Sequence, residues 1–438
     1  MPETEKTFLI MSLTLDKLLG VDGVRAPISP ESATDWMDEC SSSSDVLDDA
    51  LLRLVNQTTN GKAMPVNLTG LQELLEQTTA LHGGERDGEE HLQVTLGHAL
   101  MMVSLEEGLL PYAELLLQYA NAAGVNFAAP DDGDTVLQKC VEHENFHLAQ
   151  LLIKHGADCK KANQKYATTP LHKACSLPNP VPWIHLLCEA GADPNAQNCD
   201  GRTPLHICML GNVRDHEDAI LQGVELLIKY GSDLSAADRG GNTALLYVRS
   251  MLQDGAYDAA KTFADALLGS GADPNCRNCE QRSLLAYSIG CLDNSVDLTR
   301  LLINYGALVW SMDWDDTEHS AFAWYLKAVI NQTRYENCAR TLEVLCRVMG
   351  AHPQTMYSHM LRTMFRHVRC FRVLGPVFLE IKHAMMRYWT GPPQLRYLCW
   401  RAIRRSMQPH NVERRARTLG LPSRLERYLT MEDVTCDK

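Results

Sequence analysis

The chain has few aromatic residues, no long apolar run and none of the short motifs that mark common enzyme classes. Phe, Trp and Tyr make up 7% of the 438 residues, and no stretch approaches the roughly 20 apolar residues that span a bilayer. There is no phosphate-binding loop, no Gly-x-Ser-x-Gly elbow and no paired-carboxylate motif. These absences argue against a membrane protein, a nucleotide-dependent enzyme and the commonest hydrolases.

The chain also has neither a secretion signal nor a cysteine pattern typical of disulfides. Charged residues such as Glu5, Lys6 and Asp16 interrupt the first 20 residues, where a signal peptide would be continuously apolar. The 15 cysteines are an odd number and are scattered through helix-like apolar patterns, which suits buried thiols better than a disulfide framework. We therefore expect a reducing compartment, the cytoplasm or the nucleus.

Charge is distributed unevenly along the sequence. Residues 1–92 carry 17 acidic and 6 basic side chains, a net of -11, out of -13 for the whole chain. Residues 387–438 carry 11 basic and 5 acidic side chains, a net of +6. We assign residues 1–92 to an acidic N-terminal region that is partly helical or disordered. A helix pair that caps the rest of the chain is an open alternative for part of it.

Two motifs recur in phase through the middle of the chain. The first occurs as Asp134-Thr135-Val136-Leu137, Thr169-Pro170-Leu171-His172, Thr203-Pro204-Leu205-His206, Thr243-Ala244-Leu245 and Ser283-Leu284-Leu285, at spacings of 34, 34, 40 and 40 residues. The second occurs as Gly156-Ala157-Asp158, Gly191-Ala192-Asp193, Gly231-Ser232-Asp233, Gly271-Ala272-Asp273 and Gly306-Ala307. Two motifs locked in one order indicate a repeat architecture.

Each repeat is explained by a turn, a short helix, a loop and a second helix. Thr203-Pro204 supplies a capping hydroxyl and a proline at the first helical position. A glycine such as Gly231 ends the second helix, because it adopts a left-handed conformation without a Cβ clash. One helix pair cannot bury its apolar face, whereas a stack of pairs can.

The repeats resemble ankyrin repeats over roughly residues 94–314. This predicts an all-α fold, an ankyrin-repeat solenoid of five or six repeats over 93–316. We expect residues 317–389 to form a helical region with a degenerate further repeat. The two 40-residue spacings imply insertions around residues 212–222 and 252–261, which we expect to lengthen the connections between paired helices.

A separate helical box is predicted at residues 390–430, with residues 431–438 as a tail. Pro393 can open a helix in which Leu395, Cys399 and Ile403 are spaced four residues apart on one face. A second short helix is expected over 411–418. A last turn should follow Leu421-Pro422, opened by Ser423 and Glu426 in a capping-box pattern.

This box resembles a SOCS box. The resemblance implies that Leu395, Cys399 and Ile403 bind Elongin C. It also implies cullin binding by Leu421, Pro422, Leu425 and Tyr428. One departure is Gln394, which stands where the family usually has a small residue or proline.

Ankyrin repeats followed by this box resemble the ankyrin repeat and SOCS box proteins. The resemblance implies a non-catalytic substrate receptor of a ubiquitin ligase, with the ankyrin surface binding the substrate. Elongin B, Elongin C and a cullin of the fifth class with its RING-box protein would be the partners, and no cofactor would be needed. The alternative is an ankyrin scaffold or adaptor in which the C-terminal helices only cap the stack.

Two metal-type patterns compete with this interpretation. His143-Glu144-Asn145-Phe146-His147 matches the zinc-protease motif, which requires both histidines on one helix. Counting back from Gly156 places Glu144-Asn145 in a loop between helices, so we expect no site there. Cys276-Arg277-Asn278-Cys279 has no second pair nearby. His172 and His206 are expected to tie the turns of their repeats rather than to act in catalysis.

Two tryptophans are candidates for substrate binding. Trp310 stands where earlier repeats have Asn195 and Asn275, and Trp314 stands at the place of the hairpin-tip residue Cys199. Tryptophan is favoured at binding hot spots, and packing under the helices after Ser320 is the alternative. The arginines of residues 396–427 could form a nucleic-acid patch, but solvated helix faces are favoured because no nucleic-acid-binding fold accompanies them.

Overall fold

The structure is a computed structural model of the whole chain, and part of that chain is described here. The described residues are 68, 71–73, 75–76, 79, 86–104, 109–130, 132–211, 213–309, 320–331, 338–349, 383, 403, 412, 418 and 422–431. The chain forms two compact units, one of residues 1–177 with 182–199 and the other of residues 178–181 with 200–438. Trp310, Trp314, Leu395, Cys399 and Leu421 lie outside the described residues.

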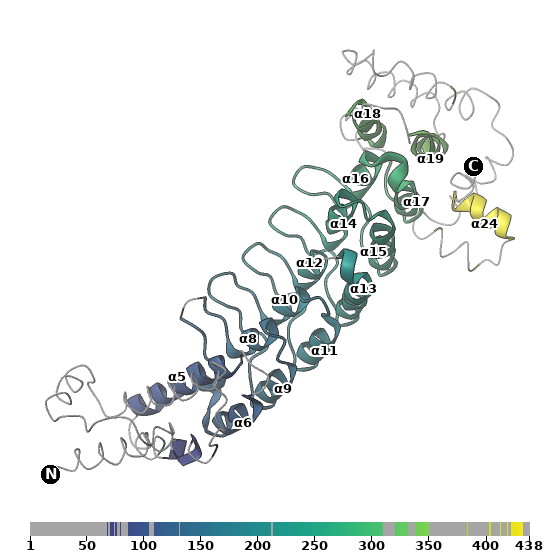
Figure 1. Cartoon of the computed structure of the whole chain (residues 1–438). Coiled ribbons are helices and arrows are strands. Elements are labelled where there is room, and N and C mark those ends of the chain that lie inside the picture. The colour runs from purple at the N-terminus through teal and green to yellow at the C-terminus, as the bar shows by residue number, and fades with distance from the viewer. Residues whose placement is uncertain are drawn as a thin grey trace, which may run out of the picture. The chain divides into compact units, whose positions relative to one another are not determined.

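The first unit is built from helices (Figure 1). They are α5 (Arg86–Val103), α6 (Leu110–Tyr119), α7 (Ala122–Val125), α8 (Val136–Glu142), α9 (Phe146–Lys154), α10 (Pro170–Cys175) and α11 (Val181–Glu189). α8 pairs with α9 and packs against α10, the first helix of the next repeat. α5 packs against both α6 and α7 on the N-terminal side of these pairs.

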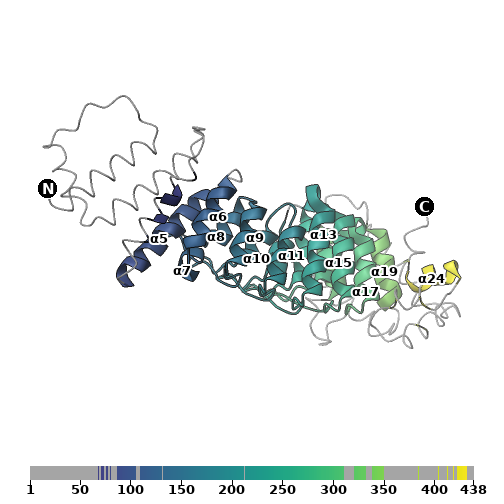
Figure 2. The same ribbon diagram turned by 90° about the horizontal axis from the view of Figure 1, so that it is seen from below.

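The second unit continues the same alternation of a first and a second helix in each repeat. Its helices are α12 (Pro204–Cys208), α13 (Val213–Lys229), α14 (Ala244–Gln253), α15 (Tyr257–Gly269), α16 (Leu284–Gly290), the 3-10 turn η2 (Leu292–Ser295), α17 (Val296–Asn304), α18 (Ala321–Asn331), α19 (Ala339–Met349) and α24 (Ser423–Leu429). α12, α14, α16 and α18 form one row (Figure 1), and α13, α15, α17 and α19 form the other (Figures 1 and 2). α18 and α19 thus make a further helix pair after the last recognisable repeat motif.

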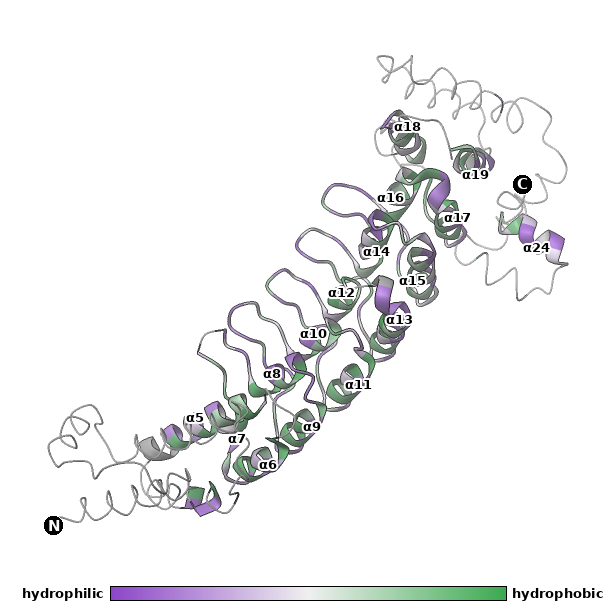
Figure 3. Ribbon diagram, viewed as in Figure 1, coloured by the Kyte–Doolittle hydropathy of each residue, from purple (hydrophilic) through white to green (hydrophobic). Residues whose placement is uncertain are grey.

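An apolar layer lies between the two rows of helices within each unit. The motif leucines and their partners on the second helices are fully or almost fully buried. They include Leu137, Leu171, Leu205, Leu245, Leu285, Leu152, Leu187, Leu227, Leu267 and Leu302. Figure 3 shows polar residues concentrated on the loops that project beside the first helices of the repeats. Among the described residues, extended pairing is limited to isolated bridges, so the all-α prediction is confirmed.

A hydrogen-bonded turn starts the first helix of several repeats. The Thr135 hydroxyl accepts from the Gln138 backbone N–H at 3.2 Å, and the Gln138 side chain accepts from the Thr135 N–H at 2.8 Å. His206 replaces the glutamine in its repeat, and its Nδ1 accepts from the Thr203 N–H at 3.1 Å. His172 makes the same bond at 3.2 Å, which confirms that both imidazoles tie their turns.

Glycines end the second helices as predicted. Gly156 has a φ of 88°, and its N–H donates to the Ile153 carbonyl at 3.1 Å while the Ala157 N–H donates to the Leu152 carbonyl at 2.9 Å. These two bonds form a Schellman motif that satisfies the last free carbonyls of α9. Gly231 repeats the conformation with a φ of 89°.

The prediction that the insertions lengthen interhelical connections is wrong. The first insertion extends α13 at its N-terminal end, with a non-helical break at His216. The second is absorbed mainly by longer α14 and α15, which leave only three residues between them. Added helical turns satisfy their own backbone groups and bury side chains such as Ile220 and Phe263, which an exposed loop would not do.

The described structure places the two histidines of the first metal-type motif on different helical segments. His143 is the C-cap of α8 and Asn145 is the N-cap of α9, so His143 and His147 belong to different helical segments, as the repeat register predicted. No group of three His, Cys, Asp or Glu side chains arranged to bind a metal occurs in the part of the chain that the structure describes. The described helices include none with the length and apolar character needed to cross a membrane.

We predict that replacing His206 with Gln reduces the acid sensitivity of the second unit. Burial lowers the pKa of His206 below its ordinary value, although Asp238 and two carbonyls oppose this effect. Because the unfolded chain binds the proton more readily, stability should fall as pH drops below about 6.5. Gln preserves the capping box, as Gln138 shows. The thermal unfolding midpoint should therefore drop less between pH 7.5 and 5.5 in His206→Gln than in the unmodified chain.

The control for this experiment is His216→Gln, which removes an exposed histidine from the same unit. Its midpoint should show the same pH dependence as the unmodified chain. Equal pH dependence in all three proteins would contradict the prediction.

Candidate functional site

The C-terminal helix α24 starts directly after a proline. Pro422 is the N-cap, with a φ of -53° and a ψ of 138°, and it makes no side-chain capping bond. The first intrahelical bond runs from the Glu426 N–H to the Pro422 carbonyl at 3.0 Å. The predicted capping box is therefore wrong, because the extended Pro422 takes the N-cap position and Ser423 becomes the first helical residue.

Tyr428 attaches α24 to the last helix pair of its unit. Its side chain is 9% exposed and lies against Arg347 of α19, whose guanidinium carbon is 4.3 Å from the ring centroid. Nη2 of Arg347 also donates to the Tyr428 carbonyl at 3.0 Å. Arg347 itself is only 3% exposed, so a cation–π contact and a charge-assisted hydrogen bond act in a desolvated place, where both are strengthened.

A second attachment lies one helix pair earlier. Asn304, at the end of α17, is 1% exposed, and its Nδ2 donates to the Thr430 carbonyl at 3.1 Å. Leu429, Thr430 and Met431 are all buried. Met431 has a φ of 63°, a left-handed conformation that disfavours a side chain by about 1–2 kcal/mol, and the burial of its side chain offsets that cost. The end of α24 is thus held against both α17 and α19.

The predicted box residues are only partly within the described structure. The described ones are Ile403, which is helical and half-buried, Pro422, which is exposed, Leu425, whose backbone lies in α24, and Tyr428, which is buried. The ring of Tyr428 contacts this chain's own Arg347. Its role as a cullin contact stays a prediction, and its observed role is to hold the C-terminal helix in place.

Arg347 and Asn304 were not found by sequence reasoning, although each carries a signal. Asn304 occupies the repeat position of Lys154 and Lys229, which are exposed. Arg347 is a charged residue at the position where other repeats have apolar residues such as Ile153 and Ile228. Asn304 is uncharged where those repeats carry an exposed lysine, and Arg347 is charged where they carry an apolar residue. Both differences indicate a contact from outside the repeat.

A second candidate surface is formed, within each unit separately, by the first helices of its repeats. The fourth residue after each capping Thr or Ser forms one position per repeat. From the first unit to the second, the residues at this position are Lys139, Lys173, Ile207, Tyr247, Tyr287 and Trp324. The first unit therefore carries lysines there, and the second unit carries mainly aromatic residues.

The two lysines of the first unit are neutralised within that unit. Lys139 lies 3.0 Å from Asp132, 3.1 Å from Asp134 and 3.2 Å from Glu142. Lys173 pairs with Glu142 at 2.9 Å and also with Asp134. Burial opposes ionisation, but the Asp134 backbone and Lys139 lower the pKa of Asp132 to about 2. Two cations thus face three carboxylates, which leaves no excess positive charge.

Tyr247 is tied into a polar network of the second unit. Its hydroxyl donates to Oδ2 of Asp238 at 2.7 Å and accepts from Nε of Arg202 at 3.0 Å. Burial, together with the Asp238 carboxylate, raises the pKa of Tyr247 to about 12. This tyrosine is largely buried and serves the packing of its repeat.

Tyr287 and Trp324 are half-buried and lie among cations. The Tyr287 hydroxyl accepts from Arg249 Nη1 at 3.2 Å and from Asn278 Nδ2 at 3.1 Å. Arg282 lies between the two rings, 5.8 Å from the Tyr287 centroid and 5.1 Å from the Trp324 centroid. The series Arg249, Tyr287, Arg282, Trp324 and Lys327 alternates cation and ring, and we name it the cation–aromatic ladder.

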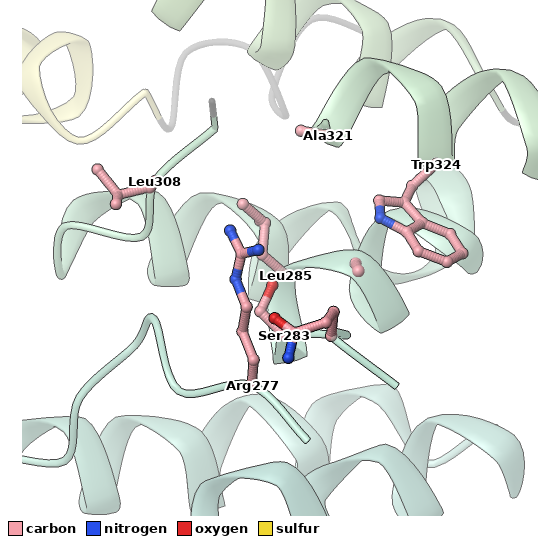
Figure 4. Close-up of a pocket in the computed structure, with 8 residues that line it drawn as sticks. Arg277, Ser283, Leu285, Leu308, Ala321 and Trp324 are labelled. Atoms are coloured by element: carbon pink, nitrogen blue, oxygen red, sulfur yellow. The ribbon is translucent and has the colours of Figure 1, made fainter. Parts of the chain in front are cut away.

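A pocket adjoins the Trp324 end of this ladder (Figure 4). It is lined by Arg277, Ser283, Leu285, Leu308, Ala321 and Trp324, among others. The Arg277 side chain extends toward Leu285, with Leu308 and Trp324 on opposite sides of it (Figure 4). Leu308 is 49% exposed, which makes it one of the few large exposed apolar side chains in the described structure.

The stacked helix pairs and the C-terminal helix agree with what the comparisons with known proteins find. A family model of ankyrin repeats, in three copies, matches residues 100–198 and 171–265, and a SOCS box model matches residues 391–430. The molecule is thus an ankyrin-repeat protein that ends in a SOCS box.

More particularly, the chain belongs to the ankyrin repeat and SOCS box proteins. It is 25% identical over 366 residues to Ankyrin repeat and SOCS box protein 6 of Homo sapiens, covering 78% of this chain and 82% of that protein. The Mus musculus protein of the same name is 26% identical over 382 residues, with 82% and 86% covered. Ankyrin repeat and SOCS box protein 16 of Homo sapiens is 28% identical over 186 residues, 42% of this chain and 39% of that one.

We predict that Tyr428→Ala releases α24 from its unit. The change removes a buried ring from Arg347 and leaves a cavity, which should cost about 3 kcal/mol of local stability. Amide hydrogen exchange over residues 423–431 should accelerate accordingly. Arg424→Ala is the matched control, because Arg424 is an exposed residue of the same helix, and its effect should stay within about 0.5 kcal/mol. Similar exchange rates in the two variants would refute the anchoring role of Tyr428.

Proposed function

We propose that the chain is the substrate-recognition subunit of an Elongin–cullin–SOCS box ubiquitin ligase. The observation that carries the proposal is the presence of a SOCS box match at residues 391–430 behind ankyrin repeats in one chain. In this proposal the box binds Elongin B and Elongin C together with a cullin of the fifth class and its RING-box protein. The ankyrin surface binds the substrate, whose ubiquitination leads to its degradation.

The mechanism is proximity rather than bond chemistry by this chain. A receptor raises the effective concentration of substrate lysines near a charged ubiquitin-conjugating enzyme. Such transfer is most efficient when the two binding parts are held in a defined geometry. The bonds from Arg347 to Tyr428 and from Asn304 to Thr430 support this, because they fix α24 to the helix pairs of its own unit.

The residues proposed to contact Elongin C are Leu395, Cys399 and Ile403. At four-residue spacing they form a narrow apolar stripe on an Arg-rich helix, which suits a helix-in-groove contact. Full burial of a leucine contributes about 1.5–3 kcal/mol, so Leu395 should be a binding hot spot. Leu421, Pro422, Leu425 and Tyr428 are proposed to select the cullin, with the exposed Pro422 as the residue best placed for an outside partner.

The second candidate function is an ankyrin scaffold without a ligase role. The burial of Tyr428, Leu429, Thr430 and Met431 against the last helix pairs favours it, because a capping helix would be expected to pack in this way. A cap does not require the stripe of Leu395, Cys399 and Ile403 to bind anything. Elongin binding therefore discriminates between the two functions.

The first test is recovery of Elongin B, Elongin C and the cullin from cell lysate. We expect the intact chain to recover all three, and a Leu395→Ser, Cys399→Phe double variant to lose them, because a polar and an oversized residue would occupy the apolar stripe. The Arg424→Ala variant serves as a folded control and should recover all three. Absence of Elongin from the intact chain's eluate would favour the scaffold.

The second test separates cullin binding from Elongin binding. Leu421→Ala with Pro422→Ala should reduce cullin recovery at least several-fold while Elongin B and Elongin C remain bound. Pro422 is exposed and makes no capping bond, so its replacement should not unpack α24. Equal loss of Elongin and cullin would show that the segment supports the whole box rather than selecting the cullin.

A further inference from the structure

The cation–aromatic ladder holds two guanidinium groups against aromatic rings. Arg249 and Arg282 lie close to the Tyr287 ring, and Arg282 also lies 5.1 Å from the centroid of Trp324. A guanidinium held on an aromatic ring keeps its planar set of N–H donors in a fixed orientation. Such preorganisation lowers the entropic cost of binding a carboxylate.

The arginines of the ladder and its pocket have few ion-pair partners among the described residues. Neither Arg249 nor Arg277 pairs with a carboxylate among the residues that the structure describes. Arg282 lies 3.3 Å from Glu280, but the two side chains are 42% and 63% exposed, so this pair is weak. The lysines at the corresponding position in the first unit are fully compensated. Arginines with few carboxylate partners are therefore a local feature of the described residues around Tyr287 and Trp324.

The exposed side chain of Leu308, beside the pocket, adds an apolar contact to the charged surface. Leu285 is buried, Leu308 is half-exposed and Trp324 is partly exposed. The Arg277 side chain also lines this pocket (Figure 4). An apolar side chain of a ligand would contact Leu308 and Trp324. The Arg277 guanidinium could then reach the ligand residues on either side of it. The combination fits a ligand with one apolar residue flanked by carboxylates.

A nucleic acid fits this surface less well than a peptide does. Single-stranded nucleic acids bind by stacking bases on open aromatic faces, whereas Arg249, Arg282 and Lys327 lie over the rings of Tyr287 and Trp324. A short acidic segment needs only the local positive charge.

We propose that the cation–aromatic ladder and the adjoining pocket bind a short acidic segment of a partner protein, with one apolar residue seated against Leu308 and Trp324. Carboxylates on either side of that residue pair with Arg249, Arg277 and Arg282. The proposal rests on the proposed function in one respect, since it takes the bound segment to belong to the ligase substrate. The surface shares no residue with the SOCS box match at residues 391–430, so substitutions can test the two separately.

The test starts with selection from a random twelve-residue peptide library displayed on phage, using the immobilised full chain. Enriched sequences should be acidic and share one large apolar residue. An Arg277→Gln, Arg282→Gln double variant should not enrich them. Lys229→Gln with Lys261→Gln is the matched control, because it removes the same charge from α13 and α15 and should enrich the same sequences.

Affinity is then measured by fluorescence anisotropy with the most enriched peptide. The Arg277→Gln, Arg282→Gln variant should bind it at least about tenfold more weakly, since two charge-assisted contacts are lost. Leu308→Ser should weaken binding several-fold without any change in charge. The Leu395→Ser, Cys399→Phe variant should bind the peptide normally, which distinguishes failure of the docking surface from failure of the ligase function.

Three results would overturn the proposal. The first is enrichment of peptides with no acidic bias, and the second is equal affinity for the double variant and its control. The third is binding that appears only after Asp313, Asp315, Asp316 and Glu318 are neutralised, because the chain's own acidic stretch would then be the occupant. Tighter binding of a single-stranded oligothymidine than of the peptide would instead assign the surface to nucleic acid.

Discussion

The turn that begins the first helix of each repeat sets the register of the whole stack. A Thr or Ser occupies the N-cap at residues 135, 169, 203, 243 and 283. In three of these the third helical residue, Gln or His, closes the turn by bonding back to the capping residue. Once this start is set, helical geometry places the second helical residue in the apolar layer and the fourth at the edge of that layer, where it is half-buried in most repeats. The core and the edge surface are therefore consequences of one local structure.

The same register produces different surfaces in the two units. In the first unit, half-buried lysines at this position pair with acidic residues from the preceding turn and helix, so their charges are neutralised within the unit. In the second unit, Tyr287 and Trp324 at that position hold arginines that contribute few internal ion pairs. The fold of the repeats does not depend on whether a lysine or an aromatic residue stands at this position, because the side chains concerned lie outside the apolar layer. Variation at these positions can thus alter recognition without altering the fold.

The repeated features of the fold were predictable because each depends on residues close together in the chain. The capping turns, the left-handed glycines and the separation of His143 from His147 all follow from local geometry. The insertions were misjudged because residues 212–222 and 252–261 can form either loops or helical turns, and burial of Ile220 and Phe263 decides between them. The Ser423 capping box failed because the conformation of Pro422 competes with it.

The contacts that hold the C-terminal helix could not be predicted in this way. Arg347 and Tyr428 are 81 residues apart, and Asn304 and Thr430 are 126 residues apart. No periodicity links residues at such distances, and only the unusual chemistry of Arg347 and Asn304 within their repeats pointed to a partner. The pairing of rings with arginines in the ladder is a similar case, because it joins residues from successive repeats whose side-chain directions are not evident from spacing.

The attachment of Tyr428 also bears on what a shortened form of this protein would do in a cell. A chain that stops before this residue would lack the ring and the carbonyl that the buried Arg347 contacts, so the last helix pairs would lose stability along with the end of the box. Such a product would be cleared as a misfolded protein rather than persist as a receptor that captures its partner without delivering it. A nonsense allele that removes Tyr428 and the residues after it should therefore behave as a recessive loss of function rather than as a dominant inhibitor.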